Sequence, residues 1–545
     1  MTIDGTAERT TRSPRLLSSS QLSAAARRLI DESLADPLGG MSPSVYETAR
    51  LVTLAPWLTG HAERVRFLLR TQRADGGWVS AIPGYRVVPT LSATEALLAV
   101  LRTPERPVPG VTRRELTAAA DRGLRALLPL LDGERSFPLP DMPAVEHLAP
   151  MLIELINGHL DELEPWRDGP RLRPSPQMAP KTAALVRELL RRGQALPQKL
   201  LHALELGGEA ARGAATVRPE PIGTVGASPA ATAAWLGDRE PADHEPARRF
   251  LESAAAPHGG PVPSVLPITV FERAWMTSWL IRSGVPLAAP PQLPDFLQAS
   301  LGPAGTGGGA GLPSDADTSS GTMYALALLG RLQRPDLLWR YETDTHFCTW
   351  QGENGRSVGT NSHVLEAFGV HLREAAPAER SERHAATVRK VVSWLQEQQQ
   401  DDGSWSDRWH SSPYYGTVCS APALAEFGGP QAAPAVDRAV EWVLQTQRPD
   451  GSWGLWEGTA EETAYAVQIL LLTRREADGR VLAAAHRGGE YLRTVTAGGT
   501  AMPPLPPLWH DKDLYTPFRI VQAAILAALH LTCPDGAVPP PRRPS

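Results

Sequence analysis

The sequence has few cysteines, no long apolar run and no excess of positive charge, and each absence excludes a class of protein. Its 545 residues include three widely separated cysteines, so neither a disulfide framework nor a cysteine-rich zinc site is expected. Lys and Arg total 54 against 59 Asp and Glu, with no basic block, so no nucleic-acid partner is expected. No stretch of ~18 uninterrupted apolar residues occurs, which argues against stable membrane insertion.

The two ends of the chain carry no sign of a targeting segment. Residues 1–20 lack the apolar core of a secretion signal, so a cytoplasmic location is expected. Residues 534–545 are rich in proline and are expected to form a disordered tail.

The hydrophobic pattern indicates an all-α protein. Apolar residues recur at steps of three and four, for example in 181–193 and 516–531, whereas strict alternation is hard to find. The 52 prolines and 47 glycines cluster between these segments, where they would end one helix before the next begins.

Three similar stretches indicate a repeated helical device. FLLRTQRADGGW ends at Trp78, WLQEQQQDDGSW at Trp405 and WVLQTQRPDGSW at Trp453. Each carries a glutamine near a helix end, a polar Asp-Gly turn and then a tryptophan. We expect the glutamine amide to bind backbone groups at the N-terminus of the next helix and the indole to cover the turn. Stacked α-hairpins of this kind are expected to close into α/α barrels.

These repeats resemble the QW motifs of the terpene cyclase and prenyltransferase-like α/α barrels. Further segments resemble the class II diterpene cyclases, and they follow one another in order along nearly the whole chain. They are SPSVYETARLVTLAPW from Ser42, LHALE from Leu201, GASPAATAAWL from Gly226, PITVFERAWMTSWLIRSG from Pro267, SVGTNSHVLEAFG from Ser357, DGSWSDRWHSSPYYGT from Asp402 and LWHDKDLYTPFRIV from Leu508.

The resemblance implies two helical barrels, called β and γ, with the active site between them. We expect the β domain to comprise 15–45 and 263–533 and the γ domain to be inserted at 46–262. No class I domain and no DDxxD segment is expected, because the paired Asp401 and Asp402 fall in a repeat turn. The diphosphate of a substrate is therefore expected to survive the reaction.

The DADT segment at 315–318 resembles the Asp-x-Asp-Asp motif of these enzymes, whose middle aspartate protonates an alkene. The resemblance makes Asp317 the general acid, places Asp315 before it and puts Thr318 where the family has a third aspartate. An aspartate of ordinary pKa, ~3.9, would be ionised at neutral pH. Burial and the charge of Asp315 are expected to keep Asp317 protonated, against the helix dipole. The alternative is that both aspartates only cap a helix.

The same resemblance supplies partners for the acid and a lining for the carbocation. His363 aligns with a residue that contacts the middle aspartate, and Asn361 lies close to it in sequence. A satisfied core histidine is the alternative for His363. Aromatic faces attract cations, so aromatic residues in the family-like segments are candidates for the lining, although several are expected to be plain core. They are Trp275, Trp279, Phe347, Trp350, Trp409, Tyr414 and Tyr415.

The diphosphate end needs positive charge, and a metal ion bound with the substrate is expected there. Lys512, Arg408 and Arg519 are the candidates, with ordinary surface ion pairs as the alternative. Glu146 matches a family glutamate and is the candidate ligand for Mg²⁺ bound with the diphosphate. The acidic cluster that precedes it in the family survives here only as LLDGERSF, residues 130–137.

The sequence therefore predicts an isomerase, a class II terpene cyclase that acts as a monomer or homodimer on a linear isoprenyl diphosphate. The DADTS variant favours farnesyl diphosphate to drimenyl diphosphate; the alternative is geranylgeranyl diphosphate to a copalyl-type diphosphate. A squalene cyclase is disfavoured because more QW repeats and an apolar membrane-docking patch would be needed. Zinc-dependent protein prenylation and a non-catalytic α/α barrel that binds a lipid or a partner remain as more distant alternatives.

Overall fold

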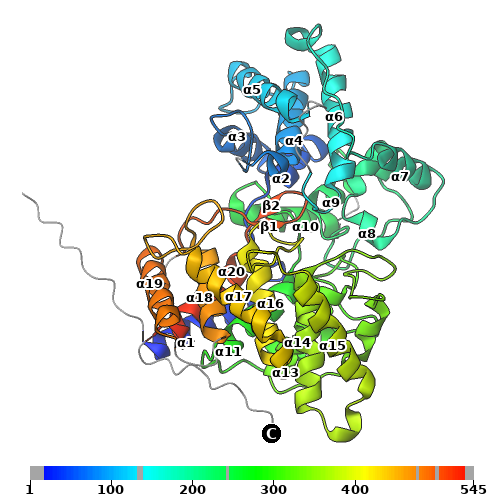
Figure 1. Ribbon diagram of the computed structural model, residues 1–545. Coiled ribbons are helices and arrows are strands. Elements are labelled where there is room, and N and C mark those ends of the chain that lie inside the picture. The colour runs from blue at the N-terminus through cyan, green and yellow to red at the C-terminus, as the bar shows by residue number, and fades with distance from the viewer. Residues whose placement is uncertain are drawn as a thin grey trace, which may run out of the picture.

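A computed structural model describes residues 18–80, 82–131, 139–240, 245–473, 478–497 and 502–533. The predicted tail at 534–545 and the first three residues of the predicted β domain, 15–17, lie outside this part. Figure 1 shows two groups of helices, one above the other, with a short hairpin between them. In the described part of the chain, no helix combines the length and the apolar character that crossing a bilayer requires.

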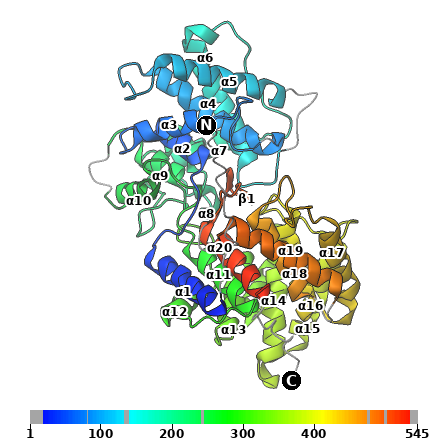
Figure 2. The same ribbon diagram turned by 90° about the vertical axis from the view of Figure 1, so that its left-hand side faces the viewer.

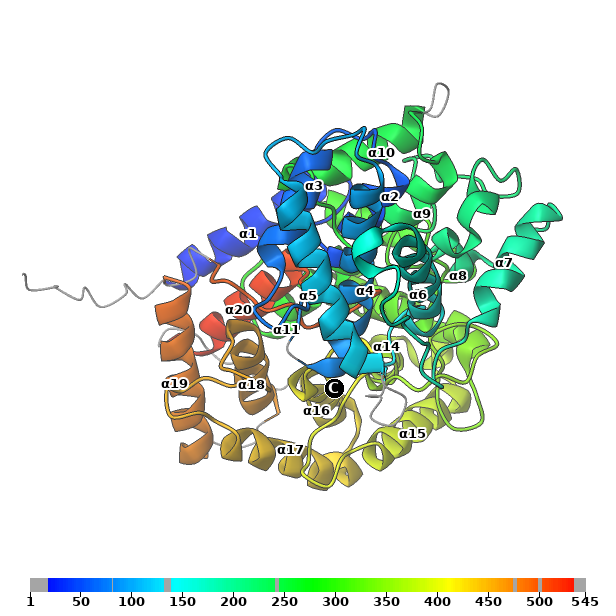
Figure 3. The same cartoon turned by 90° about the horizontal axis from the view of Figure 1, so that it is seen from above.

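The C-terminal barrel is a closed ring of inner helices surrounded by outer ones (Figure 3). Each inner helix packs against the next, and the last packs against the first. The inner helices are α11 (Thr269–Arg282), α13 (Ala316–Leu328), α14 (Val358–Glu374), α16 (Pro413–Phe427), α18 (Ala460–Leu472) and α20 (Phe518–Leu531). The outer helices are α1 (Ser19–Ala35), α12 (Gln292–Ser300), α15 (Glu382–Glu397), α17 (Ala433–Gln445) and α19 (Gly479–Val495). Figure 2 shows α1 lying along this barrel, where it packs against α11 and α20.

Sequence pattern decides which helices are inner and which are outer. Helix α18 is buried over almost its whole length, so it lies inside the ring. Helix α17 buries only the face formed by Ala435, Val436, Ala439, Trp442 and Val443. This spacing marks an amphipathic helix with one face to solvent.

The N-terminal barrel repeats this plan on a smaller scale. Its inner ring consists of α2 (Val45–Leu54), α4 (Pro83–Arg102), α6 (Val145–Glu162), η2 (Leu204–Ala211) and α9 (Pro229–Leu236), and α9 packs back on α2. Its outer helices are α3 (His61–Thr71), α5 (Arg113–Leu131), α7 (Lys181–Arg191) and α10 (Glu245–Ala255). Short helices complete the described chain: η1 (Glu164–Trp166), α8 (Gln198–Leu201), η3 (Ala256–His258), η4 (Pro335–Tyr341), η5 (Pro377–Glu379) and η6 (Pro430–Ala432).

A two-stranded hairpin joins the barrels. Strands β1 (Trp509–His510) and β2 (Leu514–Tyr515) pair antiparallel, with Trp509 opposite Tyr515. Leu514 belongs to the apolar core of the N-terminal barrel, although it comes from the segment that leads into α20. The hairpin thus inserts into the neighbouring barrel. The predicted all-α class with two α/α barrels is confirmed, whereas the predicted boundaries at 46 and 262 stay predictions.

The three repeats form the same joint, with one difference from the prediction. The indoles of Trp78, Trp405 and Trp453 are fully buried, and each Nε1 donates to a carbonyl of the preceding helix at 2.7–2.8 Å. The glutamine amide donates to the carbonyl of its own turn and to a second carbonyl. That second carbonyl belongs to the next outer helix around the ring. Gln399, for example, follows the outer helix α15 and donates to the carbonyl of Ala435 in the outer helix α17 at 2.8 Å. The predicted contact with the next helix's N-terminus is therefore wrong, because consecutive outer helices are neighbours around the ring.

Candidate active site between the two barrels

Asp315 begins the site, and its role is to cap α13. Its carboxylate accepts from the Thr318 backbone N–H at 2.6 Å and from the Thr318 Oγ1 at 3.0 Å. The helix-cap alternative therefore holds for Asp315. Thr318, which stands where the family has an aspartate, holds Asp315 rather than Asp317.

Asp317 is placed differently, although it lies only two residues further along. It keeps some accessible surface, while Asp315, Ala316 and Thr318 around it are buried. Its Oδ1 is itself buried and has no hydrogen-bond partner. A carboxyl oxygen without donors has lost what would stabilise the anion, so the protonated acid is favoured.

The surroundings of Asp315 and Asp317 raise the pKa of both carboxyl groups, which favours their protonated forms. Burial and the charge of Asp407 raise the pKa of Asp317, His363 and Thr360 lower it, and the net pKa is about 6. Burial, followed by repulsion from Asp317, raises the pKa of Asp315 well above its usual range. Repulsion between the two carboxyl groups acts on the pKa of Asp315, whereas the expected contribution of the Asp315 charge is not among the causes of the rise at Asp317. The predicted rise at Asp317 therefore comes chiefly from burial.

His363 lies on α14, near enough to Asp317 for its charge to lower the pKa of that carboxyl, and it has a carboxylate partner of its own. Its Nδ1 lies 2.8 Å from Glu366 Oε2, one helical turn away. Burial lowers the pKa of His363, but contacts with Cys419 and Glu366 raise it well above its usual range. An imidazolium beside Asp317 would stabilise the carboxylate that remains after proton transfer.

Sequence reasoning missed two carboxylates near the acid. Glu366 was detectable from its spacing of three from His363 in HVLE, which puts both on one helix face. Asp407 accepts from Ser357 Oγ and Gly359 N, both at 2.9 Å, and so fixes the start of α14. No local pattern identified Asp407, because its partners lie about fifty residues earlier in the chain.

Asn361 does not contact the acid. Its Oδ1 accepts from Phe347 N, and its Nδ2 donates to Phe347 O and Ser357 O, all at 2.9 Å. These bonds use the amide fully and hold the loop before α14. The prediction that it acts with His363 on Asp317 is corrected to a role in bracing this loop.

A layer of aromatic rings begins at His363. The Trp275 ring lies 4.7 Å from the His363 ring, and its Nε1 donates to Tyr415 OH at 3.1 Å. Tyr415 lies 4.6 Å from Trp509, and Phe271 lies 4.6 Å from Trp275. The structure thus brings the predicted Trp275 and Tyr415 together beside the acid and adds Phe271 and Trp509.

Three other predicted lining residues have different surroundings. Trp279 stacks on Tyr465 at 5.5 Å, so it extends the aromatic layer away from the acid. Phe347 is fully buried and packs on Phe368, and Tyr414 packs on Trp442 of the outer helix α17. Phe347 and Tyr414 therefore pack within the apolar core, and their role as lining residues stays a prediction. Tyr414 and Tyr415 are adjacent, but consecutive helical residues point in directions about 100° apart.

Two tryptophans and two cations meet where the barrels face each other. The rings of Trp350 and Trp409 lie 5.5 Å apart, and Lys199 Nζ from the N-terminal barrel lies 3.9 Å above Trp350. Arg408 pairs with Asp141 of the N-terminal barrel at 2.8 Å. Ala316 N donates to Thr349 O, next to Trp350, so this junction adjoins the start of α13. Arg408, Trp350 and Trp409 thus lie together at the junction.

Lys512 does not face a ligand. Its side chain is fully buried, and its Nζ donates to Glu47 at 2.7 Å, to Glu205 at 3.0 Å and to Ser228 at 2.8 Å. Burial lowers the pKa of Lys512, but Glu205 and Glu47 raise it well above its usual range. All three ammonium hydrogens are used, so the prediction of Lys512 as a diphosphate ligand is wrong.

The other two residues of the hairpin turn are also satisfied inside the N-terminal barrel. Asp511 accepts from Ser264 and lies 3.0 Å from His202 Nε2. Asp513 accepts from Ser44 Oγ at 2.8 Å and from Tyr46 N at 2.9 Å. The turn 511–513 is therefore an ionic joint between the barrels.

Arg519 is a structural residue of α20. Its guanidinium binds Asp36 at 2.9 Å and Glu272 at 3.1 Å, which ties α1 and α11 to α20. The prediction of Arg519 as a diphosphate ligand is corrected, because its guanidinium is already paired with these two carboxylates.

Glu146 lies in the first turn of α6, is 43% exposed and contacts His147 at 3.3 Å. Across the described ranges, no three His, Cys, Asp or Glu side chains are placed to hold a metal ion together. These residues alone do not fit a magnesium site, and most of the acidic segment 130–137 lies outside the described residues. The predicted Mg²⁺ and the role of Glu146 stay predictions.

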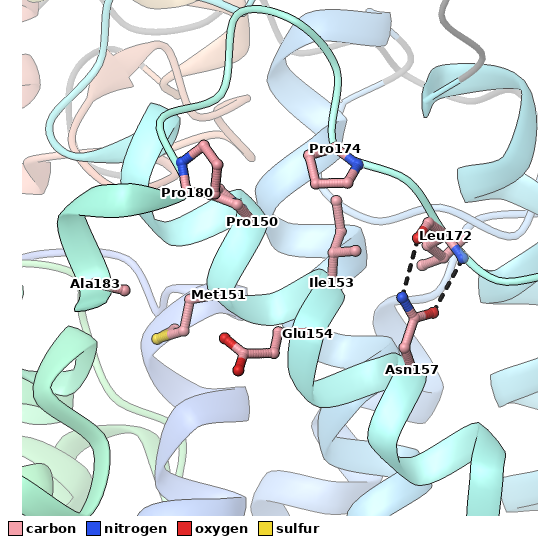
Figure 4. Close-up of a pocket in the computed structure, with 9 residues that line it drawn as sticks. All are labelled: Pro150, Met151, Ile153, Glu154, Asn157, Leu172, Pro174, Pro180 and Ala183. Atoms are coloured by element: carbon pink, nitrogen blue, oxygen red, sulfur yellow. Dashed lines mark hydrogen bonds between the residues drawn. The ribbon is translucent and has the colours of Figure 1, made fainter. Parts of the chain in front are cut away.

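A pocket of about 230 Å³ opens beside α6 in the N-terminal barrel (Figure 4). Apolar residues from α6 and α7 line it, and Asn157 closes one side by two hydrogen bonds to the Leu172 backbone at 3.0 Å. None of its lining residues is a predicted site residue.

Comparison with known proteins identifies relatives along the whole chain. Residues 358–495 match the model of the squalene-hopene cyclase C-terminal domain. An ent-copalyl diphosphate synthase from Streptomyces sp. (strain KO-3988) is 44% identical over 94% of this chain and 96% of its own. A labda-7,13-dienyl diphosphate synthase from Streptomyces clavuligerus is 42% identical over 93% of this chain and 92% of its own. The solved ent-copalyl diphosphate synthase from Streptomyces platensis is 44% identical, with a TM-score of 0.87, and covers 94% of this chain and 99% of that one.

Proposed function

Because the chain belongs to the class II terpene cyclases, a family of isomerases, we propose that it cyclises geranylgeranyl diphosphate to a copalyl-type diphosphate. The relatives reported above are named for copalyl and labda-7,13-dienyl diphosphate, not for drimenyl diphosphate. These relatives favour the C20 substrate, geranylgeranyl diphosphate, over the C15 substrate, farnesyl diphosphate, which the DADTS segment predicts. The observation that carries the chemistry is the buried, unpartnered Oδ1 of Asp317.

Asp317 starts the reaction by giving its proton to the terminal double bond. The alkene π electrons form the new C–H bond, the O–H electron pair stays on Asp317, and a tertiary cation results. Burial is the main cause that raises the pKa of Asp317 to about 6, so a share of the molecules carries the proton near neutral pH, and His363 stabilises the carboxylate that forms. Successive double bonds then close two rings, and a final proton loss leaves an isomer of the substrate with its diphosphate intact.

Trp275 and Tyr415 give the migrating cation a polarisable wall beside the acid. Each ring face attracts a cation by ~0.5–2 kcal/mol without offering a nucleophile as strong as water. Their mutual hydrogen bond fixes both rings, so these faces do not have to reorganise during the reaction.

The diphosphate is assigned to the junction where Lys199 and Arg408 meet. Each cation comes from a different barrel and, within the described ranges, pairs with one carboxylate; the side chains of those carboxylates are 36% and 67% exposed. A diphosphate could displace such exposed carboxylates, because surface pairs contribute only ~0–1 kcal/mol. Replacing Lys199 and Arg408 by Ala is expected to raise KM for the substrate by about tenfold or more, with a smaller change in kcat. Arg480→Ala, at an exposed pair on α19, is the control that leaves KM unchanged.

Product analysis tests the substrate assignment. Purified protein is incubated separately with geranylgeranyl and farnesyl diphosphate, the products are dephosphorylated, and their skeletons are identified. Bicyclic C20 alcohol, with kcat/KM higher for the C20 substrate, is the expected result. Faster formation of drimenol from farnesyl diphosphate would reverse the assignment.

A further inference from the structure

A second carboxylate lies at the far end of the aromatic layer. Glu461, at the start of α18, is fully buried, and its Oε1 accepts from Trp509 Nε1 at 2.7 Å and from Tyr465 OH at 3.0 Å. His410 Nε2 lies 3.2 Å from the same oxygen. Oε2 is also buried and has no hydrogen-bond partner. Three donors converge on Oε1, which favours the carboxylate anion although Oε2 has none. The Asp317 carboxyl differs, because Thr360 is the one side chain that bonds to it among the described residues.

The negative charge of Glu461 has no positive partner among the residues that the structure describes. Lys and Arg form no ion pair with it there, and the histidine beside it is neutral. His410 Nδ1 accepts from Ser412 N at 3.0 Å, so the ring proton must be on Nε2, from which it is donated to Glu461. Burying a carboxylate that only neutral groups solvate is costly, so such an arrangement calls for a function.

Glu461 is connected to the acid through the rings. His410 stacks on Tyr415 at 5.0 Å, and Tyr415 also packs on Trp509 and Tyr465. Tyr415 in turn accepts from Trp275, which lies against His363 beside Asp317. One continuous aromatic layer therefore runs from Asp317, the proposed proton donor, at one end to Glu461, the buried carboxylate behind the rings, at the other.

We propose that Glu461 is a positioning residue for the cyclisation: it fixes the Trp509 and Tyr465 rings and supplies the counter-charge for the carbocation after it has left Asp317. The inference rests on the function proposed above. A negative charge behind the rings adds to the attraction of their faces for a cation, and the low dielectric of this region strengthens the effect. The cation then survives until the second ring closes.

Glu461→Gln tests this, because it keeps the shape of the side chain and removes the charge. We expect kcat for geranylgeranyl diphosphate to fall about tenfold with little change in KM. We also expect a larger share of monocyclic or hydroxylated products, because the cation is lost to elimination or water before the second closure. Glu461→Asp, which restores the charge, should move the product ratio back toward wild type.

Glu462→Gln is the matched control. Glu462 is the next residue on α18 and is also buried, but it accepts from Leu455 N and Thr459 Oγ1 in the loop before its own helix and from Ser412 Oγ at the start of α16. Its substitution should lower Tm and leave the product ratio unchanged. If Glu461→Gln does not fold, Tyr465→Phe removes one donor to Glu461 and should shift the ratio in the same direction by less.

The outcomes separate the two proposals. If Glu461→Gln folds and keeps the wild-type product ratio and kcat, the role of Glu461 is overturned and the proposed function stands. If Glu461→Gln does not fold, an unchanged product ratio in Tyr465→Phe overturns that role in the same way. Failure of the wild-type protein to cyclise geranylgeranyl diphosphate would instead overturn the function on which it rests.

Discussion

Buried carboxylates occur both at the interdomain joint and at the start of α13, and the fold treats them in opposite ways. At the joint, Lys512 forms direct ion pairs with Glu47 and Glu205, and Ser228 takes the remaining ammonium hydrogen, although Glu205 Oε2 has no donor. At α13, Asp317 Oδ1 also has no donor, and no Lys or Arg in the described part of the chain forms an ion pair with Asp317. Paired charges fix a geometry, whereas an unpaired carboxyl group retains a proton that it can give away.

The comparison also changes what the family-like segments mean. Three of these segments supply Glu47, Glu205 and Ser228 from the N-terminal barrel. Their side chains meet at Lys512, which belongs to the hairpin of the C-terminal barrel. Their resemblance to class II cyclases therefore marks the joint that holds the barrels together. The acid chemistry proposed above is assigned to the DADT segment and its neighbours in space.

The largest effect is expected from Asp317→Asn, which removes the transferable proton and keeps the shape. Cyclisation should fall by about 10²–10⁴-fold, because a positioned general acid contributes this much. Single-turnover product formation measures it. The exposed Asp401→Asn in a repeat turn is the control, and an Asp317→Asn enzyme that is as active as this control would disprove the assignment of the acid.

Lys512→Met should have the largest effect on stability. It leaves two buried carboxylates without their partner, which costs about 3–5 kcal/mol in the free energy of unfolding. Urea denaturation measures the loss. Lys199→Met, at an exposed pair, should cost only about 0–1 kcal/mol. Adding Glu47→Gln and Glu205→Gln to Lys512→Met should recover part of the stability; no recovery would show that the joint is not electrostatic.

The pH dependence should differ between activity and folding. Because Asp317 must be protonated to act, kcat/KM should fall about tenfold per pH unit above its pKa of about 6. For folding, the native state binds this proton more tightly than the unfolded state, whose carboxyl pKa is ordinary, at 3.8. The contribution of Asp317 to stability is therefore complete below pH 4 and is lost as the pH rises to about 6. Asp317→Asn should abolish that part of the stability profile, and an unchanged profile would contradict the shift.

The smallest effect is expected from Thr318→Val, which removes the hydroxyl bond to Asp315 and keeps the backbone bond. A loss of about 1 kcal/mol in stability is expected, with cyclisation retained, because the cap rather than the acid is weakened. Thermal denaturation measures it against Thr494→Val on the exposed face of α19. Loss of activity as large as in Asp317→Asn would place Thr318 in the chemistry.

The sequence by itself determined the helices, the positions of the repeated joints and the candidate for the acid, Asp317. These depend on residues close together in the chain: the apolar period of each helix, the Gln and Asp-Gly-x-Trp of each turn, and two aspartates at a helix start. The His363–Glu366 pair was accessible in the same way, since its members lie one helical turn apart.

Only the tertiary structure decided which polar groups find partners. Lys512 and Glu47 are 465 residues apart, and nothing near either one shows that closing the two barrels would bring them together. For the same reason Tyr415 joins the aromatic layer while the adjacent Tyr414 faces the outer helices. Whether a charge is neutralised or left unpaired depends on what surrounds it in space, and here that difference separates the joint from the acid.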